Sequence, residues 1–219
     1  MFKVLTKFRY LLSSGDVKFF VYEKYSLQVG NISVRLNKII YGRRLNIQFP
    51  FKVWGNIRFM FLGKGSITIG KFFHAVSSRR RSAFTLFSPC HLNIIGDGQI
   101  ILGEHVGLNG NTITARSKVY IGDNTMIGPN TIIIDHDGHQ AWPPEARWIQ
   151  SGLSKEIIIE NDVWIGMSCI ILKGVRIGSG SIIAAGSIVI HDVEANSLYA
   201  GNPAKKIKSL GNVSKNLTI

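Results

Sequence analysis

Two histidines and two aspartates lie within five residues of one another, in the segment Asp135-His136-Asp137-Gly138-His139. An imidazole has a pKa near neutrality, so either histidine could act as a general base, and a nearby carboxylate could hold its ring in one tautomer. An aspartate before a glycine is also common in turns for conformational reasons alone. The four side chains could instead ligate a metal, but no further ligand is evident elsewhere, and no metal is expected.

These residues open a segment, 135–156, that differs from both of its flanks. It contains two adjacent prolines and two tryptophans, and it has no internal repeat. An insertion of this length between regular runs is typical of a loop extruded from a rigid scaffold, where functional side chains are often found. The planar donors of Arg147 and the aromatic faces of Trp142 and Trp148 could contact a sugar, or they could equally pin the loop.

The scaffold is recognisable from the repeat that follows. Residues 159–194 divide into sixes in which the first position is Ile or Val and the fifth is small or β-branched. The first positions are Ile159, Ile165, Ile171, Ile177, Ile183 and Val189, and the fifth are Val163, Cys169, Val175, Ser181, Ser187 and Val193. Because six is even, both positions face the same side of an extended strand, whereas a helix cannot keep this period in phase. The pattern predicts a β-solenoid with these positions inside.

The same repeat is present before the loop, with less regularity. Residues 102–113 and 121–132 contain two sixes each, and Thr112, Thr125 and Thr131 are expected at the small inward position. Residues 26–90 contain only fragments of the repeat, which predicts irregular early coils.

Most of the net positive charge lies in the first quarter of the chain. The formal net charge is +13, and residues 1–58 hold eleven Lys or Arg against two acidic residues. Apolar residues at near-helical spacing in residues 1–25 predict a partly helical cap, because a solenoid end otherwise exposes its core. This basic, aromatic-bearing region is either a solvated cap face or a contact for anionic lipid headgroups.

Other features limit the compartment and the partners. Nucleic-acid binding would predict aromatic residues interleaved with a basic stripe, whereas the charge here is mostly terminal, so no nucleic acid is expected. Cys90 and Cys169 form no disulfide framework, which favours a reducing compartment. No apolar run reaches the roughly 18 residues of a membrane span, and no signal peptide is evident. We therefore expect a cytoplasmic protein, at the inner face of the membrane if lipids are contacted.

Several motifs together resemble the hexapeptide-repeat acyltransferases, in the branch of the maltose, galactoside and colanic-acid O-acetyltransferases. They are the repeats themselves, IIIDHDGHQ at 132–140, NDVWIGMSCIILKGVRIGSGSIIAAGSIVI at 161–190 and AGNPAKKIK at 200–208. The resemblance covers about residues 95–208. It implies a left-handed parallel β-helix, a homotrimer with each active site between two subunits, and acetyl-CoA as co-substrate.

The resemblance also implies roles for the residues on the acceptor side. His139 matches the catalytic histidine, and we place Asp135 ahead of Asp137 as the carboxylate that orients it. His136 stands where the family usually has a small residue, so we expect it to be structural or substrate-contacting, with a reserve role as base. Asn109 matches the asparagine that binds the acceptor near the reacting hydroxyl, although corner asparagines are common in solenoids.

A second set of residues matches the cofactor side of the family's site. In this sequence they are Trp164, Gly166, Met167, Ala185, Lys205 and Lys208. The Met167 main-chain N–H would support the thioester oxygen. Ala185 would line the pantetheine groove, where a larger side chain would block entry, and the two lysines would meet the phosphates of CoA.

We therefore expect three parts, namely a cap at 1–25, an acyltransferase β-helix at 26–200 with its loop at 135–156, and a tail at 201–219. The expected activity is acetyl transfer from acetyl-CoA to a sugar hydroxyl of a surface polysaccharide or its precursor, in a direct ternary complex. Acetylation of an amino sugar or an antibiotic is the nearest alternative, since the same base could serve an amine. A solenoid that binds membrane or nucleic acid without catalysis is an alternative from a different class.

Overall fold

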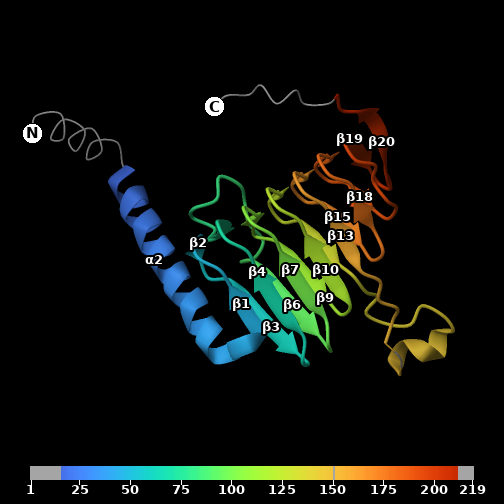
Figure 1. The fold of residues 1–219 in the computed structure, drawn as a ribbon, viewed down its shortest axis with the longest axis horizontal. Helices are drawn as coiled ribbons and strands as arrows, with labels where there is room; N and C mark the ends of the chain where they lie inside the picture. The colour runs from blue at the N-terminus through green and yellow to red at the C-terminus, as the bar shows by residue number, and fades with distance from the viewer. Residues whose placement is uncertain (1–15, 150, 212–219) are drawn as a thin grey trace, which may run out of the picture.

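The computed structural model describes residues 16–149 and 151–211, so most of the predicted cap, residues 1–15, lies outside the described residues. Within them, one long helix is followed by short strands that wind into a three-sided prism (Figure 1). The helical elements are α2 (Asp16–Tyr41), η1 (Gly42–Arg44) and η2 (Pro144–Trp148). No helix among these residues is long and apolar enough to cross a bilayer.

The strands form three sheets, here called faces A, B and C. Face A contains β1 (Leu45–Ile47), β4 (Ser66–Ile69), β7 (Gln99–Leu102), β10 (Lys118–Ile121), β13 (Ile157–Ile159) and β16 (Arg176–Ile177). Face B contains β2 (Phe51–Gly55), β5 (Phe73–Ser77), β8 (Gly107–Asn109), β11 (Met126–Ile127), β14 (Trp164–Ile165), β17 (Ile182–Ile183), β19 (Ser197–Gly201) and β20 (Ala204–Ser209). Face C contains β3 (Arg58–Leu62), β6 (His91–Ile95), β9 (Thr112–Ala115), β12 (Ile132–Ile134), β15 (Ile170–Leu172) and β18 (Ile188–Val189).

Each turn of the chain visits the three faces in order, so paired strands from β1 to β18 are parallel and three apart in sequence, and β19 then pairs in parallel with β17. The register is constant from coil to coil, as in the alignment of Ile121 with Ile159 and of Ile159 with Ile177. Only the last pair, β19 and β20, is antiparallel within the described residues. The predicted solenoid is confirmed, and β1 to β6 extend it regularly into residues that the sequence had suggested were irregular.

The inward positions form one continuous core. Every first and fifth position of the sixes at 159–194 is buried, as are Thr125 and Thr131. The prediction for Thr112 is wrong, because Asn111 is fully buried there instead and Thr112 faces outward. Asn111 can occupy the core because its amide bridges coils, accepting from the Asn109 N–H at 2.5 Å and donating to the Gly128 carbonyl at 2.7 Å.

Helix α2 covers the open end of the first coil. The Val53 N–H donates to Asn31 Oδ1 at 3.0 Å, Lys38 Nζ donates to the Ile47 carbonyl at 3.1 Å, and the Tyr41 hydroxyl donates to the Phe59 carbonyl at 3.1 Å. These bonds reach the first strand of each face, so the helix satisfies edge groups that would otherwise be unpaired.

The helix is longer than the predicted cap. The expected boundary at residue 25 falls inside α2, and the expected tail at 201–219 includes strand β20. The β-branched residues and Gly30 in this part of α2 resemble a repeat fragment, but packing against β2 overrides their weak helix propensity. The three-part division itself stays a prediction.

Gly30 sets the distance between the helix and the first coil, because a Cβ there would lie 2.1 Å from the Val53 carbonyl oxygen. We expect Gly30→Ala to lower the free energy of unfolding by about 1–3 kcal/mol, since steric overlap outweighs the better helix propensity of alanine. Gln28→Ala, at an exposed position on the same helix, should change it by less than about 0.5 kcal/mol. Denaturant unfolding at fixed protein concentration measures both, and equal stability of the two variants would contradict this packing.

Candidate active site

A groove with a volume of about 550 Å³ lies along the corner where face B turns into face C. Five of the residues predicted from the sequence line it, and they come from successive coils. They are Asn109, Trp164, Gly166, Met167 and Ala185. The parallel register places these residues together, since Met126 pairs with Trp164, and Trp164 pairs with Ile182.

Close packing of the coils keeps the floor of this groove small and smooth. A Cβ on Gly166 would lie 2.5 Å from the Ala185 nitrogen, and a Cβ on Gly128 would lie 2.6 Å from the Met167 nitrogen. Side chains at these corners would push the coils apart. Ala185 itself is exposed, so its methyl group forms part of the wall without filling the groove.

Two polar groups in the groove have no hydrogen-bond partner among the described residues. At the corner, the Gly166 N–H bonds to the following coil and the Ser168 N–H to the preceding one, but the Met167 N–H between them donates to none of the described residues. The side-chain oxygen of Asn109 is buried and also lacks a hydrogen bond within the described structure. An unpaired buried acceptor is costly, so both groups are suited to a bound ligand.

Lys205 and Lys208 lie on β20, at the end of face B beyond the groove. Lys205 aligns with Ala200 and Lys208 with Leu198, and Leu198 in turn aligns with Ile182 in the groove. Both lysines are exposed. Their position continues the line of the groove, as expected for groups that would meet phosphates.

The opposite end of the groove contains residues that sequence reasoning missed. His74, Phe84 and Gly107 line it together with Asn109. Burial, followed by the charges of Lys52 and His105, lowers the pKa of His74, so its ring is neutral at pH 7. Gly107 lies between His74 and Met126 on the sheet, and a Cβ there would meet nothing within 4 Å. His74 and Phe84 precede the clear repeats, and Gly107 is the last residue of the first six, so no motif marked them.

Phe84 reaches the groove from the loop between β5 and β6. This loop is held against the corner by Asn130, whose Oδ1 accepts from the Phe87 N–H at 3.0 Å and whose Nδ2 donates to the Thr85 carbonyl at 2.7 Å. The buried Leu86 packs beneath it. Phe84 therefore forms a positioned wall of the groove.

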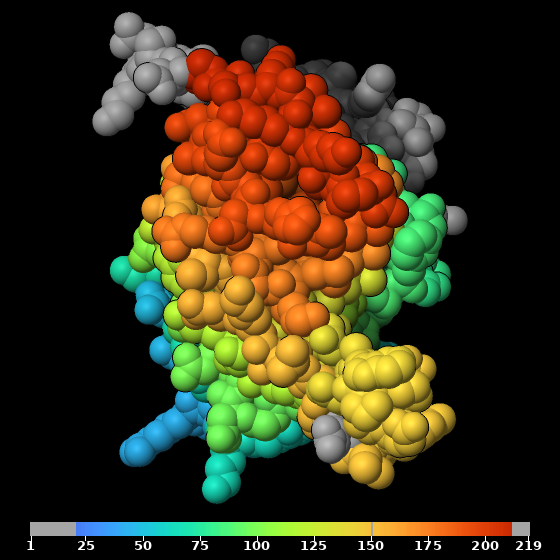
Figure 2. Space-filling view, turned by 90° about the vertical axis from the view of Figure 1, so that its right-hand side faces the viewer, coloured from blue at the N-terminus to red at the C-terminus, as the bar shows by residue number. Residues whose placement is uncertain are grey.

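The histidine loop, residues 135–156, leaves the prism at the corner where face C turns into face A, and it stands out from the body (Figure 2). A second hollow of about 370 Å³ on this loop is lined by His139, Pro144, Arg147 and Trp148. His139 Nδ1 lies 2.7 Å from the Arg147 carbonyl oxygen. A carbonyl only accepts, so Nδ1 carries the proton, and Nε2 of the neutral ring is left as the base.

The orienting role predicted for Asp135 is wrong in this structure. Asp135 is fully buried, and its carboxylate accepts from the main-chain N–H groups of Arg116 and Ser117, both at 2.8 Å. Its third contact is His136 Nδ1 at 3.0 Å, not His139. The Arg147 carbonyl takes the place of a carboxylate beside His139. Asp135 is an anchor that fastens the start of the loop to the preceding coil.

His136 and Asp137 also hold the loop. His136 is buried and pairs with Ser154 across the base of the loop, so the substrate contact and reserve-base role predicted for it are not available from this position. Asp137 forms an ion pair with Lys173 at 2.5 Å, and its N–H donates to the Leu153 carbonyl. The structure therefore supports the alternative in which these residues stabilise the turn itself.

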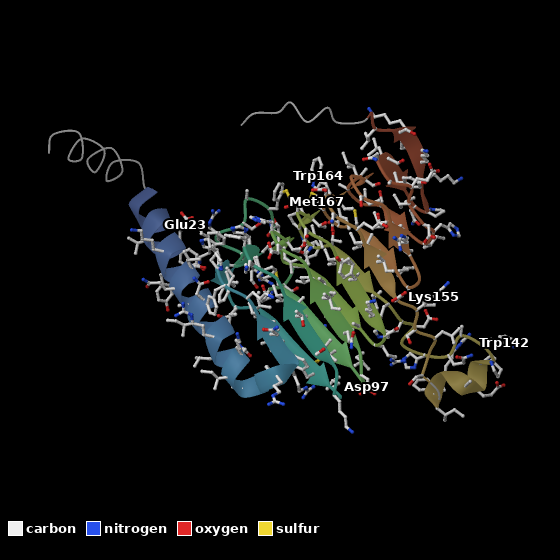
Figure 3. The ribbon with its side chains drawn as sticks, viewed as in Figure 1. Glu23, Asp97, Trp142, Lys155, Trp164 and Met167 are labelled. Carbon is white, nitrogen blue, oxygen red and sulfur yellow. The ribbon has the colours of Figure 1, made fainter. Side chains whose placement is uncertain are left out.

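The predicted sugar-contacting residues divide into two groups. Arg147 pins the loop, since its guanidinium donates to the Ala141 carbonyl from two nitrogens at 3.3 Å, yet it also lines the hollow with Trp148. Trp142 does not line this hollow and is largely exposed, pointing away from the prism (Figure 3). No group of three His, Cys, Asp or Glu side chains that could hold a metal is present among the described residues.

The groove and the histidine loop are at different corners of one chain. Figure 3 shows Trp164 and Met167 at one edge of the prism and Trp142 on the loop at another edge. Face C separates the two corners, because the chain leaves the groove corner, forms β12 and only then enters the loop. One chain therefore does not bring His139 to Met167 and Asn109.

The anchor role of Asp135 can be tested directly. Asp135→Ala would leave two partly buried N–H groups and the buried His136 ring without their acceptor, so we expect it to lower the free energy of unfolding by about 2–4 kcal/mol. Asp137→Ala removes a half-exposed ion pair and should cost less than about 1 kcal/mol. Denaturant unfolding of both variants at the same protein concentration compares them. If Asp137→Ala were the more damaging substitution, the anchor would be misassigned.

Comparison with known proteins agrees with this architecture. Residues 156–191 match the family model for the bacterial transferase hexapeptide with six repeats. The galactoside O-acetyltransferase of Lactococcus lactis is 35% identical over 116 residues, or 52% of this chain and 55% of that protein. The 2,3,4,5-tetrahydropyridine-2,6-dicarboxylate N-acetyltransferase of Clostridium perfringens is 54% identical over 61 residues, or 28% of this chain and 26% of that protein. The chain thus spans about half or less of the length of these relatives.

Among solved structures, AntD, an N-acyltransferase from Bacillus cereus, is similar with a TM-score of 0.58. The match covers 81% of this chain and 87% of that chain at 18% sequence identity, so it shows a shared fold alone. With the repeats, the three parallel faces and these similarities together, the chain contains the bacterial transferase hexapeptide at residues 156–191 and folds as a left-handed parallel β-helix, as its motifs indicated.

Proposed function

We propose that this protein is an acetyl-CoA-dependent acetyltransferase that modifies a sugar hydroxyl, in a polysaccharide or its precursor, and works as a homotrimer. The observation that carries the proposal is the groove at the corner of faces B and C. It combines a small wall residue, Ala185, with the unpaired Met167 N–H and the unpaired Asn109 oxygen. The O-acetyltransferase and N-acetyltransferase relatives support the reaction class.

The groove suits a long thioester lying across successive coils. The pantetheine arm would pass Ala185 and Trp164, the phosphates would meet Lys205 and Lys208, and the thioester would lie at Met167. An apolar wall with few polar groups is what an extended, mostly apolar arm requires. No protein nucleophile is needed when both substrates are held together.

The transfer step would combine His139 of one copy with the groove of another. Nε2 of His139 accepts the proton of the acceptor hydroxyl as its oxygen attacks the thioester carbonyl. The Met167 N–H donates to the carbonyl oxygen as negative charge develops on it. When the carbon–sulfur bond breaks, His139 returns the proton to the leaving sulfur, which gives free CoA and an acetyl ester. Asn109 would accept a hydrogen bond from the acceptor.

This step requires two copies of the chain, because His139 and Met167 lie at different corners of one prism. In a ring, the histidine loop of one copy would lie against the groove of the next, and a head-to-tail contact of this kind closes into a trimer. The hollow formed by Arg147 and Trp148 would then cover the acceptor beside Asn109. The loop is anchored at its base by Asp135 and Asp137, which suits it to reach a neighbour.

We also place the protein in the cytoplasm, as two buried free cysteines favour.

Acetylation of an amine is the second candidate. It is favoured by the identity of 54% to an N-acetyltransferase over 61 residues. The same histidine could deprotonate an amine, and the acceptor residues named above do not distinguish nitrogen from oxygen. Only the identity of the acceptor, a hydroxyl or an amine, distinguishes the two candidate functions.

The main test follows release of the CoA thiol from acetyl-CoA with a panel of sugars, nucleotide sugars, polysaccharides and amino sugars. We expect a sugar hydroxyl to accept the acetyl group, and His139→Ala to lower kcat about 10²- to 10⁴-fold with little change in the KM for acetyl-CoA. His105→Ala, which alters an exposed histidine stacked on Phe72, is the matched control. Undiminished turnover by His139→Ala would exclude the base, and acceptance by amino sugars alone would favour the second candidate.

The shared site makes a separate prediction. His139→Ala and Ala185→Trp should each inactivate their own homotrimers, the second by filling the groove. Equal co-expression should restore activity to about one quarter of wild type, because about one site in four then combines an intact loop with an intact groove. Steady-state rates of the mixed preparation measure this recovery. Activity no higher than the sum of the two inactive variants would place both halves of the site in one chain.

A further inference from the structure

The outer side of helix α2 carries a stripe of largely exposed apolar side chains. Val21, Tyr25, Ile32, Leu36, Ile39 and Ile40 are each more than half exposed. At about 100° per residue these positions fall within about 100° of the helix surface. The residues that face the prism, Ser26, Gly30 and Val34, lie almost opposite. The apolar stripe is therefore not part of the side of α2 that packs against the prism.

Basic residues border this stripe. Around the C-terminal part of α2, a hollow of about 750 Å³ is lined by Arg35, Lys38 and Arg43 together with Ile39. No acidic side chain lines it. Residues 16–58 contain eight Lys or Arg and two acids, and one of these acids, Glu23, is paired with Arg81 at 3.2 Å. The surface next to the apolar stripe is thus strongly cationic.

The arginines near the other end of the helix are already used. Arg81 pairs with Glu23 and lies over the Trp54 ring, and Arg80 lies over the Tyr22 ring. These contacts fasten the β5–β6 loop to α2 and keep the helix in place across the end of the prism (Figures 1 and 3). The helix is consequently a fixed platform whose outer side faces away from the strands.

We propose that this outer side of α2 docks the protein on an anionic lipid bilayer. The side chains of Leu36, Ile39 and Ile40 would enter the headgroup boundary, while Arg35 and Arg43 would meet lipid phosphates in the adjacent hollow. An apolar row beside basic residues complements an anionic bilayer, in which an apolar interior lies beneath negatively charged headgroups. A second protein copy would satisfy the apolar row, but it would bring the same positive charge against this hollow. The proposal is independent of the proposed acetyl transfer.

Sedimentation with vesicles tests the docking surface in the full-length protein. The vesicles contain one-third phosphatidylglycerol in phosphatidylcholine, with pure phosphatidylcholine as the neutral comparison. We expect binding to the anionic vesicles, and loss of at least about tenfold in partitioning for the double variant Leu36→Glu with Ile39→Glu. Arg35→Gln with Arg43→Gln should also lose about tenfold and should bind with a weaker dependence on salt.

Ile207→Glu is the matched control, because Ile207 is similarly exposed on β20 at the opposite end of the prism. It should bind as wild type, and thermal unfolding should show that all variants remain folded. Failure of the wild type to bind anionic vesicles would overturn the proposal, as would equal losses in Ile207→Glu. Unchanged binding in both double variants would place the contact elsewhere. If the Leu36→Glu variant changed only the oligomeric mass by light scattering, the stripe would join copies of the chain instead.

Discussion

The structure depends on the close stacking of one backbone coil on the next. At the corners the coils approach so closely that a Cβ on Gly166 or Gly128 would overlap the backbone of the following coil. Between corners, inward aliphatic residues fill the prism, each contributing roughly 2 kcal/mol by burial. This combination leaves the outward positions free to vary without disturbing the fold. The groove is a direct result, since small corner residues cannot cover the surface beside them.

The same stacking decides which side chains meet. Residues at equivalent positions of successive coils align, so Asn109, Met167 and Ala185 share one corner although 76 residues separate the first from the last. The interruption at 135–156 lies at a different corner because it follows a strand of face C. In the proposed mechanism the base and the cofactor wall therefore lie at different corners of one prism, and two copies of the chain would have to bring them together.

Both ends of the histidine loop and the first coil show how breaks in the repeat are stabilised. The Asp135 carboxylate accepts hydrogen bonds from main-chain N–H groups that the departing chain would otherwise leave unpaired. At the edge of the first coil, Asn31 accepts from a main-chain N–H, and Lys38 and Tyr41 donate to main-chain carbonyls. Residues of this kind look like functional groups in a sequence. Their polar atoms bond to the backbone, whereas a buried polar atom without a partner in the described structure, such as the Asn109 oxygen, is a better candidate for a ligand contact.

By itself the sequence determined the solenoid, the inward residues of the sixes at 159–194 and the extruded loop, because a period of six leaves a direct trace in residue order. The five groove residues were named from the resemblance of their motifs to a known family, not from the repeat. The tertiary structure decided what depends on contacts between distant residues. It showed that Asp135 holds the backbone while the Arg147 carbonyl orients His139, and that His74, Phe84 and Gly107 form one end of the groove. It also extended the helix to Tyr41, because strand contacts outweigh the local propensity of that segment. Residue order does not reveal which hydrogen bonds form between coils, because a polar side chain at a corner could bond either to the backbone of a neighbouring coil or to a ligand.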